Sequence, residues 1–145
     1  MPSLFVIILI GLVGGIAVGV QAPLSSILTQ RLGVLESIFV VHIGGALVVL
    51  IPLILFGTGR LAQWRSVPWY ALLAGAFGLV VISSMTYMIP QVGVATALII
   101  LLAGQLVIAT ILDHFGWLGA AQRPIELTRI IGLSVVFFGV WLSVK

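Results

Sequence analysis

The sequence has 145 residues, of which 62% are hydrophobic and 6% are charged, whereas a soluble domain normally carries about a quarter charged residues. Six basic and three acidic side chains cannot cover a water-facing surface, so we predict an integral membrane protein. The net charge of +3 forms no basic stripe for nucleic acid, and the lack of cysteine excludes disulfides, thiol catalysis and cysteine metal sites.

Five apolar segments are long enough, or nearly so, to span a bilayer, which takes roughly 20 helical residues. We predict helices because the runs are continuous, and because lipid forces backbone groups to bond within the segment. The expected helices, in chain order, cover about residues 4–28, 34–56, 67–89, 92–112 and 127–144. The expected fold is an all-α membrane protein with five transmembrane helices in one domain, residues 1–145.

The first helix contains Pro23, which has two interpretations. A proline can kink a helix, and broken helices line binding sites in transporters. Alternatively, Pro23 marks the approach to the interface, and Ser25 and Ser26 already lie among the headgroups. No basic segment precedes the first apolar run, Leu4–Val20, which is long enough to remain in place and is not expected to be a cleaved signal.

The ends of the later helices also carry signals. Ser66 is expected to cap the third helix, with Pro68 in its first turn. A turn at about Pro90–Gln91 would make the third and fourth helices a tight hairpin. The long connection from Asp113 to Glu126 is predicted to be an interfacial loop or a short surface helix.

Five spans place the termini on opposite sides, and basic residues indicate the orientation. On the side of the N-terminus lie Arg60, Arg65, Arg123 and Arg129, and on the other side lie Arg31 and Lys145. Four against two favours a cytoplasmic N-terminus but also admits insertion in both orientations. An antiparallel homodimer would then supply the second half that transporters with inverted repeats contain.

Small residues recur along several helices. Gly11, Gly15 and Gly19 repeat every four residues and so line one face, where another backbone can approach closely. That neighbour is either another helix of the same chain or a second copy. The fourth helix has a looser version that includes Gly104, so we expect a tight bundle packed through small residues.

Polar groups inside the spans are the candidate binding residues. His42 lies about 12 Å into the second helix, where it could bind substrate or take up a proton, or could be a neutral imidazole that bonds a neighbouring helix. Gln105 is in mid-helix and cannot titrate, but its amide can bond a helix or a polar substrate. We predict Gln21, His42, Tyr87 and Gln105 as substrate-lining residues.

Two acids are candidates for a coupling or a structural charge. Glu36 is six residues before His42, about 240° around the helix, so the two face different ways; a carboxylate at a helix N-terminus favours a structural role. Asp113 ends the fourth helix, where negative charge opposes the helix dipole. We hypothesise that Asp113 pairs with Arg123 or Arg129 and pins the long loop.

The motifs of enzymes do not occur in the sequence. We find no nucleophile–base–acid set, no metal-ligand spacing and no phosphate-binding loop. The sequence therefore predicts no enzyme, no cofactor and no metal site.

Several stretches of the chain resemble a known family. They are "GGIAVGVQAPLSSILTQRLG" at 14–33, "VHIGGALVVL" at 41–50, "AGQLVIATILDHFG" at 103–116 and "RPIELTRIIGLSVVFFGVWLSV" at 123–144. They resemble the YdcZ-like family of bacterial inner-membrane proteins in the drug/metabolite transporter superfamily. The resemblance implies short five-helix chains, some with dual topology, and an exporter role with a poorly defined substrate.

The small multidrug transporters of that superfamily use a carboxylate inside the first helix. Leu4–Val20 contains no acid, so their exchange mechanism cannot be transferred to this chain. The leading interpretation is a small-molecule transporter of the bacterial inner membrane, acting as an antiparallel homodimer with alternating access. The alternatives are a half-transporter or membrane partner subunit that needs another chain, and a structural bundle without transport.

Overall fold

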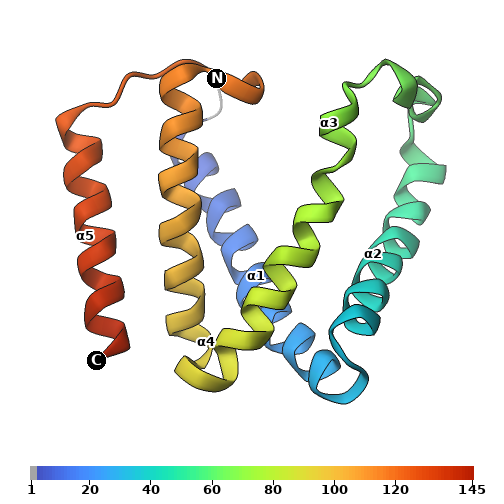
Figure 1. The fold of residues 1–145 in the computed structure, drawn as a ribbon. Coiled ribbons are helices and arrows are strands. Elements are labelled where there is room, and N and C mark those ends of the chain that lie inside the picture. The colour runs from blue at the N-terminus through green and yellow to red at the C-terminus, as the bar shows by residue number, and fades with distance from the viewer. Residues whose placement is uncertain (1–2) are drawn as a thin grey trace. The chain divides into compact units, whose positions relative to one another are not determined.

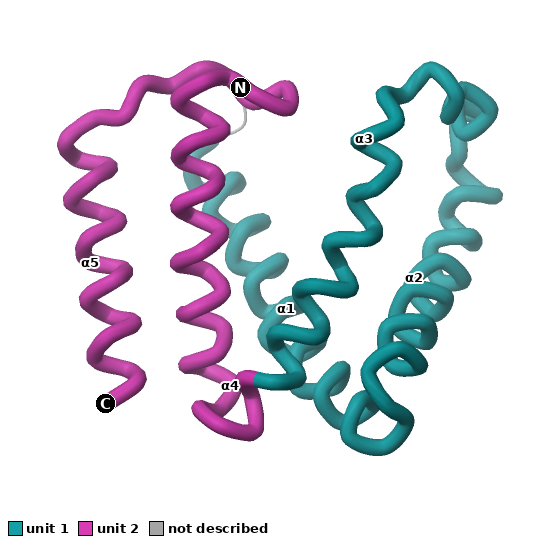
Figure 2. Tube along the Cα trace, viewed as in Figure 1, with its two compact units in different colours: residues 1–87 teal, residues 88–145 magenta. Residues whose placement is uncertain are grey.

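The computed structural model describes residues 3–145, which are helical almost throughout and contain no strand (Figure 1). The elements are α1 (Leu4–Leu32), α2 (Val34–Phe56), η1 (Arg60–Ser66), α3 (Trp69–Leu72), α4 (Ala74–Phe115), η2 (Trp117–Gly119) and α5 (Leu127–Val144). They form two compact units, residues 1–87 and residues 88–145, whose boundary lies within α4 (Figure 2). Each unit is described separately below.

The first helix of unit 1, α1, runs through Pro23 without a break and ends at Leu32, four residues beyond the expected limit. Gly33, with φ 102° and ψ 165°, is the only residue between α1 and α2. Ser25 and Ser26 are buried, at 5% and 2% exposure. Neighbouring helices of unit 1 therefore cover both side chains, and their placement among headgroups stays a prediction.

A hydroxyl cluster joins α1, α2 and α4 near Gly33. The Thr29 hydroxyl donates to the Ser25 carbonyl at 3.0 Å, within α1. Ser37 of α2, fully buried, donates to the same carbonyl at 3.2 Å. The Thr86 hydroxyl of α4 donates to the Thr29 hydroxyl at 3.2 Å. Such interhelical bonds hold helices together in lipid, where apolar side chains alone give little preference for protein neighbours.

The segment after α2 differs from the prediction. The Ser66 hydroxyl donates to the Gln63 carbonyl at 2.7 Å and does not cap the next helix. Pro68 stands at the N-cap position of the four-residue helix α3, and Leu73 separates α3 from α4. The third span therefore consists of two helical pieces, where one helix from residue 67 was expected.

The break within α4 lies at Gly93, with φ 82° and ψ 166°, and not at Pro90–Gln91. Proline has a helical φ and is tolerated within the helix, whereas only glycine readily adopts the backbone of Gly93. Trp69–Phe115 forms one apolar stretch of 47 residues. On either side of Gly93 its two parts are roughly 36 Å and 33 Å long, so each can cross a core of about 30 Å. The four long helices thus supply five spans.

In unit 2, α5 lies antiparallel beside the second part of α4 (Figure 2). At one end the Thr96 hydroxyl donates to the Ser143 carbonyl at 3.2 Å. At the other end Arg129 Nη2 lies 2.6 Å from Asp113 Oδ2. Bonds at both ends fix the register of the two helices.

Candidate functional site

An open pocket of about 380 Å³ lies between three helices of unit 1. It is lined by Gln21 of α1, by Val41, His42 and Gly45 of α2, and by Gly78, Val81 and Ile82 of α4. The lining is apolar except for two side chains, Gln21 and His42. These are two of the four residues that the sequence predicts to line a substrate site.

The helix lengths predict that the pocket lies near mid-membrane depth. Along their helices, His42 and Gln21 are roughly 14 Å and 18 Å from Gly33, where α1 and α2 meet at one membrane surface. The hydrocarbon core is about 30 Å thick, so both side chains are close to its centre. An ionisable side chain at this depth, such as that of His42, is a candidate for a functional site.

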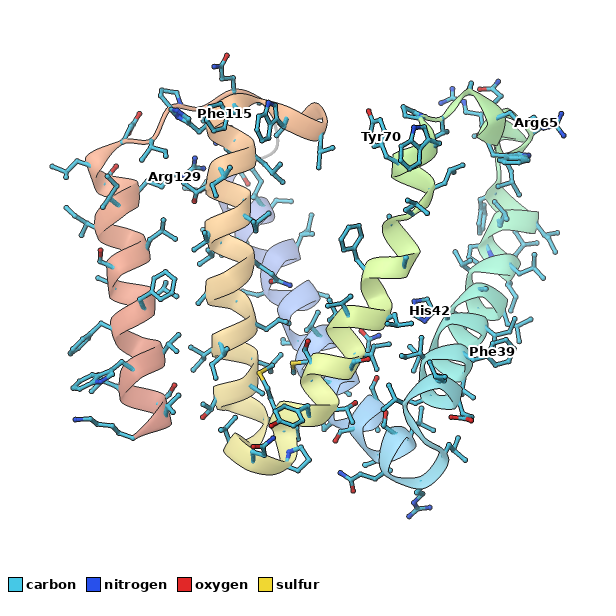
Figure 3. The ribbon with its side chains drawn as sticks, in the orientation of Figure 1. Phe39, His42, Arg65, Tyr70, Phe115 and Arg129 are labelled. Atoms are coloured by element: carbon cyan, nitrogen blue, oxygen red, sulfur yellow. The ribbon has the colours of Figure 1, made fainter. Side chains whose placement is uncertain are left out.

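One nitrogen of His42 is engaged and the other is free. Nδ1 lies 2.8 Å from the Ile38 carbonyl one turn earlier. A carbonyl can only accept, so Nδ1 carries the hydrogen. In the neutral ring, Nε2 then holds a lone pair, and it makes no hydrogen bond to any residue that the structure describes. Figure 3 shows the ring between α2 and α4.

Gly78 makes room for this ring. A Cβ atom built on Gly78 would lie 2.6 Å from His42 Nε2 and 3.0 Å from Cε1. Gly75, one turn earlier, has open space around the same position. The sequence indicates Gly78 only as one more small residue in a helix, because the partner helix of each glycine is not visible from spacing.

Gln21 presents a free carboxamide to the pocket. Its side chain is exposed and makes no hydrogen bond within residues 3–145, so it can both donate and accept. It stands two residues before Pro23, which lacks the N–H that would bond the Gly19 carbonyl. The kink interpretation of Pro23 allows a binding site near this residue. The pocket lining includes Gln21 but not Pro23, and α1 is continuous through the proline.

The other two predicted lining residues lie elsewhere. Tyr87 is on α4 in unit 1, 72% exposed, but is not part of the pocket lining. Gln105 is exposed on the part of α4 that belongs to unit 2. The structure brings Gln21 and His42 together and does not place Tyr87 in their pocket.

The charge of Asp113 is used in an ion pair. Its carboxylate and the Arg129 guanidinium, 30% and 33% exposed, are 2.6 Å apart. The loop is tied to the same place, since the Arg123 N–H donates to the Asp113 carbonyl at 2.7 Å and the Ile125 N–H donates to His114 Nδ1 at 3.3 Å. The hypothesis that Asp113 pairs with an arginine and pins the loop agrees with these contacts.

Glu36 also lies outside the pocket. It is exposed in the first turn of α2, where a carboxylate favours the helix dipole. Its Oε2 folds over Gly33, 2.7 Å from where a Cβ on that glycine would lie, and it forms no ion pair with Arg31 in the described part of the chain. Among the residues lining the pocket, His42 alone can titrate.

The glycine stripe of α1 meets no close neighbour in its own unit. A Cβ built on Gly11, Gly15 or Gly19 would meet no heavy atom of unit 1 within 4 Å, and Gly104 is equally open within unit 2. Their role in helix packing stays a prediction.

Helices that are long and apolar enough to cross a bilayer, without any strand in residues 3–145, define a multi-pass α-helical membrane protein. A family described as "Putative inner membrane exporter, YdcZ" matches residues 6–142, which is nearly the whole chain. The chain belongs to this family, and the resemblance found in the sequence is confirmed. The family's description concerns membrane transport and not catalysis. No curated protein and no solved structure matches the chain.

Proposed function

We propose that the protein is a small-molecule transporter whose substrate binds in the pocket between α1, α2 and α4. The observation that carries this proposal is the meeting of Gln21 and His42 at mid-membrane depth, on walls that are otherwise apolar. Transporter sites typically lie near the bilayer midplane and orient a substrate with a few polar groups. The membership in an exporter family supports the same conclusion.

The proposed working form is an antiparallel homodimer with alternating access. Within unit 1 the pocket is lined from three sides, by residues of α1, α2 and α4. The near balance of basic residues, four against two, permits both orientations. An inverted copy would then close the pocket and supply the symmetry-related pathway.

Unit 1 has one closed and one open end in this scheme. The hydroxyl cluster of Ser25, Thr29, Ser37 and Thr86 joins the helices on the Gly33 side of the pocket. In α1, the described residues before Gly19 are all exposed. The pocket is thus closed toward Gly33, and transport requires this end to open.

The test is flux in proteoliposomes that contain the pure protein. Uptake of arabitol, alanine and ethidium represents neutral, zwitterionic and cationic solutes. We expect uptake of at least one probe above that of empty liposomes, and a loss of about tenfold or more in Gln21→Ala and in His42→Ala. Gln63→Ala, in the exposed η1 segment, is the matched control and should retain full flux.

The results separate the alternatives. No flux of any probe would favour the half-transporter that needs another chain. Normal flux in both pocket variants would remove the proposed site, and a loss in Gln105→Ala alone would move it to unit 2.

A further inference from the structure

We infer that the pocket takes an uncharged small amphiphile that donates a hydrogen bond to His42 Nε2, and that a proton competes with it for the same lone pair. This inference rests on the proposed function and specifies its substrate class and its coupling. It follows from the hydrogen-bond geometry of the His42 imidazole and from the lack of charged side chains among the other residues that line the pocket.

The tautomer of His42 determines what its ring can bind. Nδ1 lies 2.8 Å from the Ile38 carbonyl oxygen and therefore carries the hydrogen, so the neutral ring offers Nε2 as an acceptor. Within residues 3–145 this nitrogen has no hydrogen-bond donor, and it faces Gly78, which together with His42 lines the pocket. A ligand with an O–H or N–H group satisfies it, whereas a ligand with acceptors only does not.

The residues that line the pocket determine which charge a ligand can carry. From α1 the pocket is faced by Gln21, from α4 by Gly78, Val81 and Ile82, and from α2 by Val41 and Gly45, none of which is charged. Glu36, the acid of α2, lies at the helix N-terminus on a different face. A charged ligand would lose its hydration without a counter-charge, which is costly at this depth. The pocket therefore selects neutral molecules.

A proton and a hydrogen-bond-donating ligand compete for the lone pair of His42 Nε2. Protonation of Nε2 replaces its lone pair with an N–H, so a donor ligand and the proton exclude each other. By linkage, each weakens the binding of the other by the same factor. A proton that enters from one side would thus release the ligand, and the ligand would release the proton, without any other titrating group.

Gly78 has a positioning role, because it leaves room for the His42 ring. An added methyl group would stand 2.6 Å from Nε2. The imidazole is the movable partner, so the ring would rotate away while the helices stay in place. Gly78→Ala should therefore remove the acceptor from the pocket with little change in stability, whereas Gly75→Ala, in open space, should change neither.

The experiment is nitrogen-15 NMR of histidine-labelled protein in nanodiscs. The chain has two histidines, and His114→Gln, in unit 2, assigns the signals of His42. The probes are benzyl alcohol and its isomer anisole, which match in size but of which only the alcohol donates a hydrogen bond. We expect the Nδ1–H tautomer in the neutral ring, and a saturable shift of the Nε2 signal with benzyl alcohol but not with anisole.

Acidification gives the second readout. Below the midpoint of the ring's titration, the apparent Kd for benzyl alcohol should rise about tenfold per pH unit. Gly78→Ala should weaken binding about tenfold or more, and Gly75→Ala should leave it unchanged. His42→Gln, which cannot titrate, should remove the pH dependence.

Three results would overturn the inference: an Nε2–H tautomer in the neutral ring, equal responses to the two isomers, or an affinity that does not change with pH. The proposed function fails differently. A protein that binds benzyl alcohol as described but shows no flux of any probe refutes transport alone. Flux that is independent of pH and unchanged in His42→Gln refutes the inference and leaves transport standing.

Discussion

At the scale of single residues, a polar side chain within a span is costly in free energy unless it finds a hydrogen-bond partner. The hydroxyl groups of Thr29 and Thr110 find theirs one turn earlier, at the carbonyls of Ser25 and Leu106. His42 does the same with one nitrogen and leaves the other, which faces Gly78, without a partner in residues 3–145. This remaining capacity distinguishes a candidate binding residue from a hydroxyl that its own helix satisfies.

The ion pair of Asp113 and Arg129 gives a prediction at this scale. Asp113→Asn removes the acceptor charge at 2.6 Å and leaves the half-buried guanidinium without its counter-charge. Loss of a hydrogen bond between charged groups typically costs about 1.5–3 kcal/mol. We expect a lower melting temperature in detergent, measured by the unfolding of the purified protein.

Glu126→Gln is the control for charge removal, because its side chain makes no capping hydrogen bond at α5. Equal melting of Asp113→Asn and wild type would contradict the structural role of the pair.

At the scale of elements, two glycines set where helices end. Gly33 and Gly93 share an unusual backbone, with φ 102° and 82° and ψ 165° and 166°. This region is essentially confined to glycine and costs other residues about 1–3 kcal/mol. Each glycine follows a long apolar helix directly, so no polar loop separates the helical segments on its two sides.

The second prediction follows from Gly93. Gly93→Ala should lower the free energy of unfolding by about 1–3 kcal/mol, because alanine is strained at φ 82°. Gly104→Ala, in a helical part of α4 with open space around it, should be neutral or slightly stabilising. Thermal unfolding of both variants in detergent measures the difference, and equal effects would refute the strain argument.

The bounds of two helices could be predicted from the sequence, whereas the end of α1 could not. The ranges 34–56 and 127–144 coincide with α2 and α5, since apolar runs with clear polar ends are visible in the sequence. The end of α1 was predicted four residues too early, because its serines and Thr29 are buried by contacts with α2 and α4. Those contacts depend on which helices meet, which a single sequence does not reveal.

The same limit applies to the candidate site. Gln21 and His42 could be selected as polar groups in apolar runs. Gly78 could not, because its importance comes from facing His42 across two helices. Tyr87 was selected by the same rule as Gln21, yet it lies outside the pocket, since depth and residue type do not define which face of a helix lines a cavity.

At the scale of the whole molecule, the proposal of an antiparallel homodimer makes a third prediction. The chain has no cysteine, so single cysteines at Ser3 and Lys145 can be labelled separately. We expect an impermeant maleimide to reach each of them in intact spheroplasts and in inverted vesicles. With five spans, each terminus of a chain in one orientation faces one side only. Labelling of the same cysteine from both sides therefore requires chains of both orientations in the membrane.

Added positive charge provides the control. Lysines introduced beside one terminus should shift all chains to one orientation and abolish flux if the antiparallel pair is the working form. Labelling of each wild-type cysteine from one side alone would contradict dual topology.

In the proposed alternating-access scheme, the hydroxyl cluster would influence how evenly two conformational states are populated. Two of its bonds join different helices, Ser37 to the Ser25 carbonyl and Thr86 to Thr29. At about 0.6 kcal/mol each, these bonds would contribute roughly 1.2 kcal/mol to the closed end, which is a factor of about eight in the ratio of the two states. A difference in the affinity of one proton or one ligand between the two states would be enough to offset a contribution of that size.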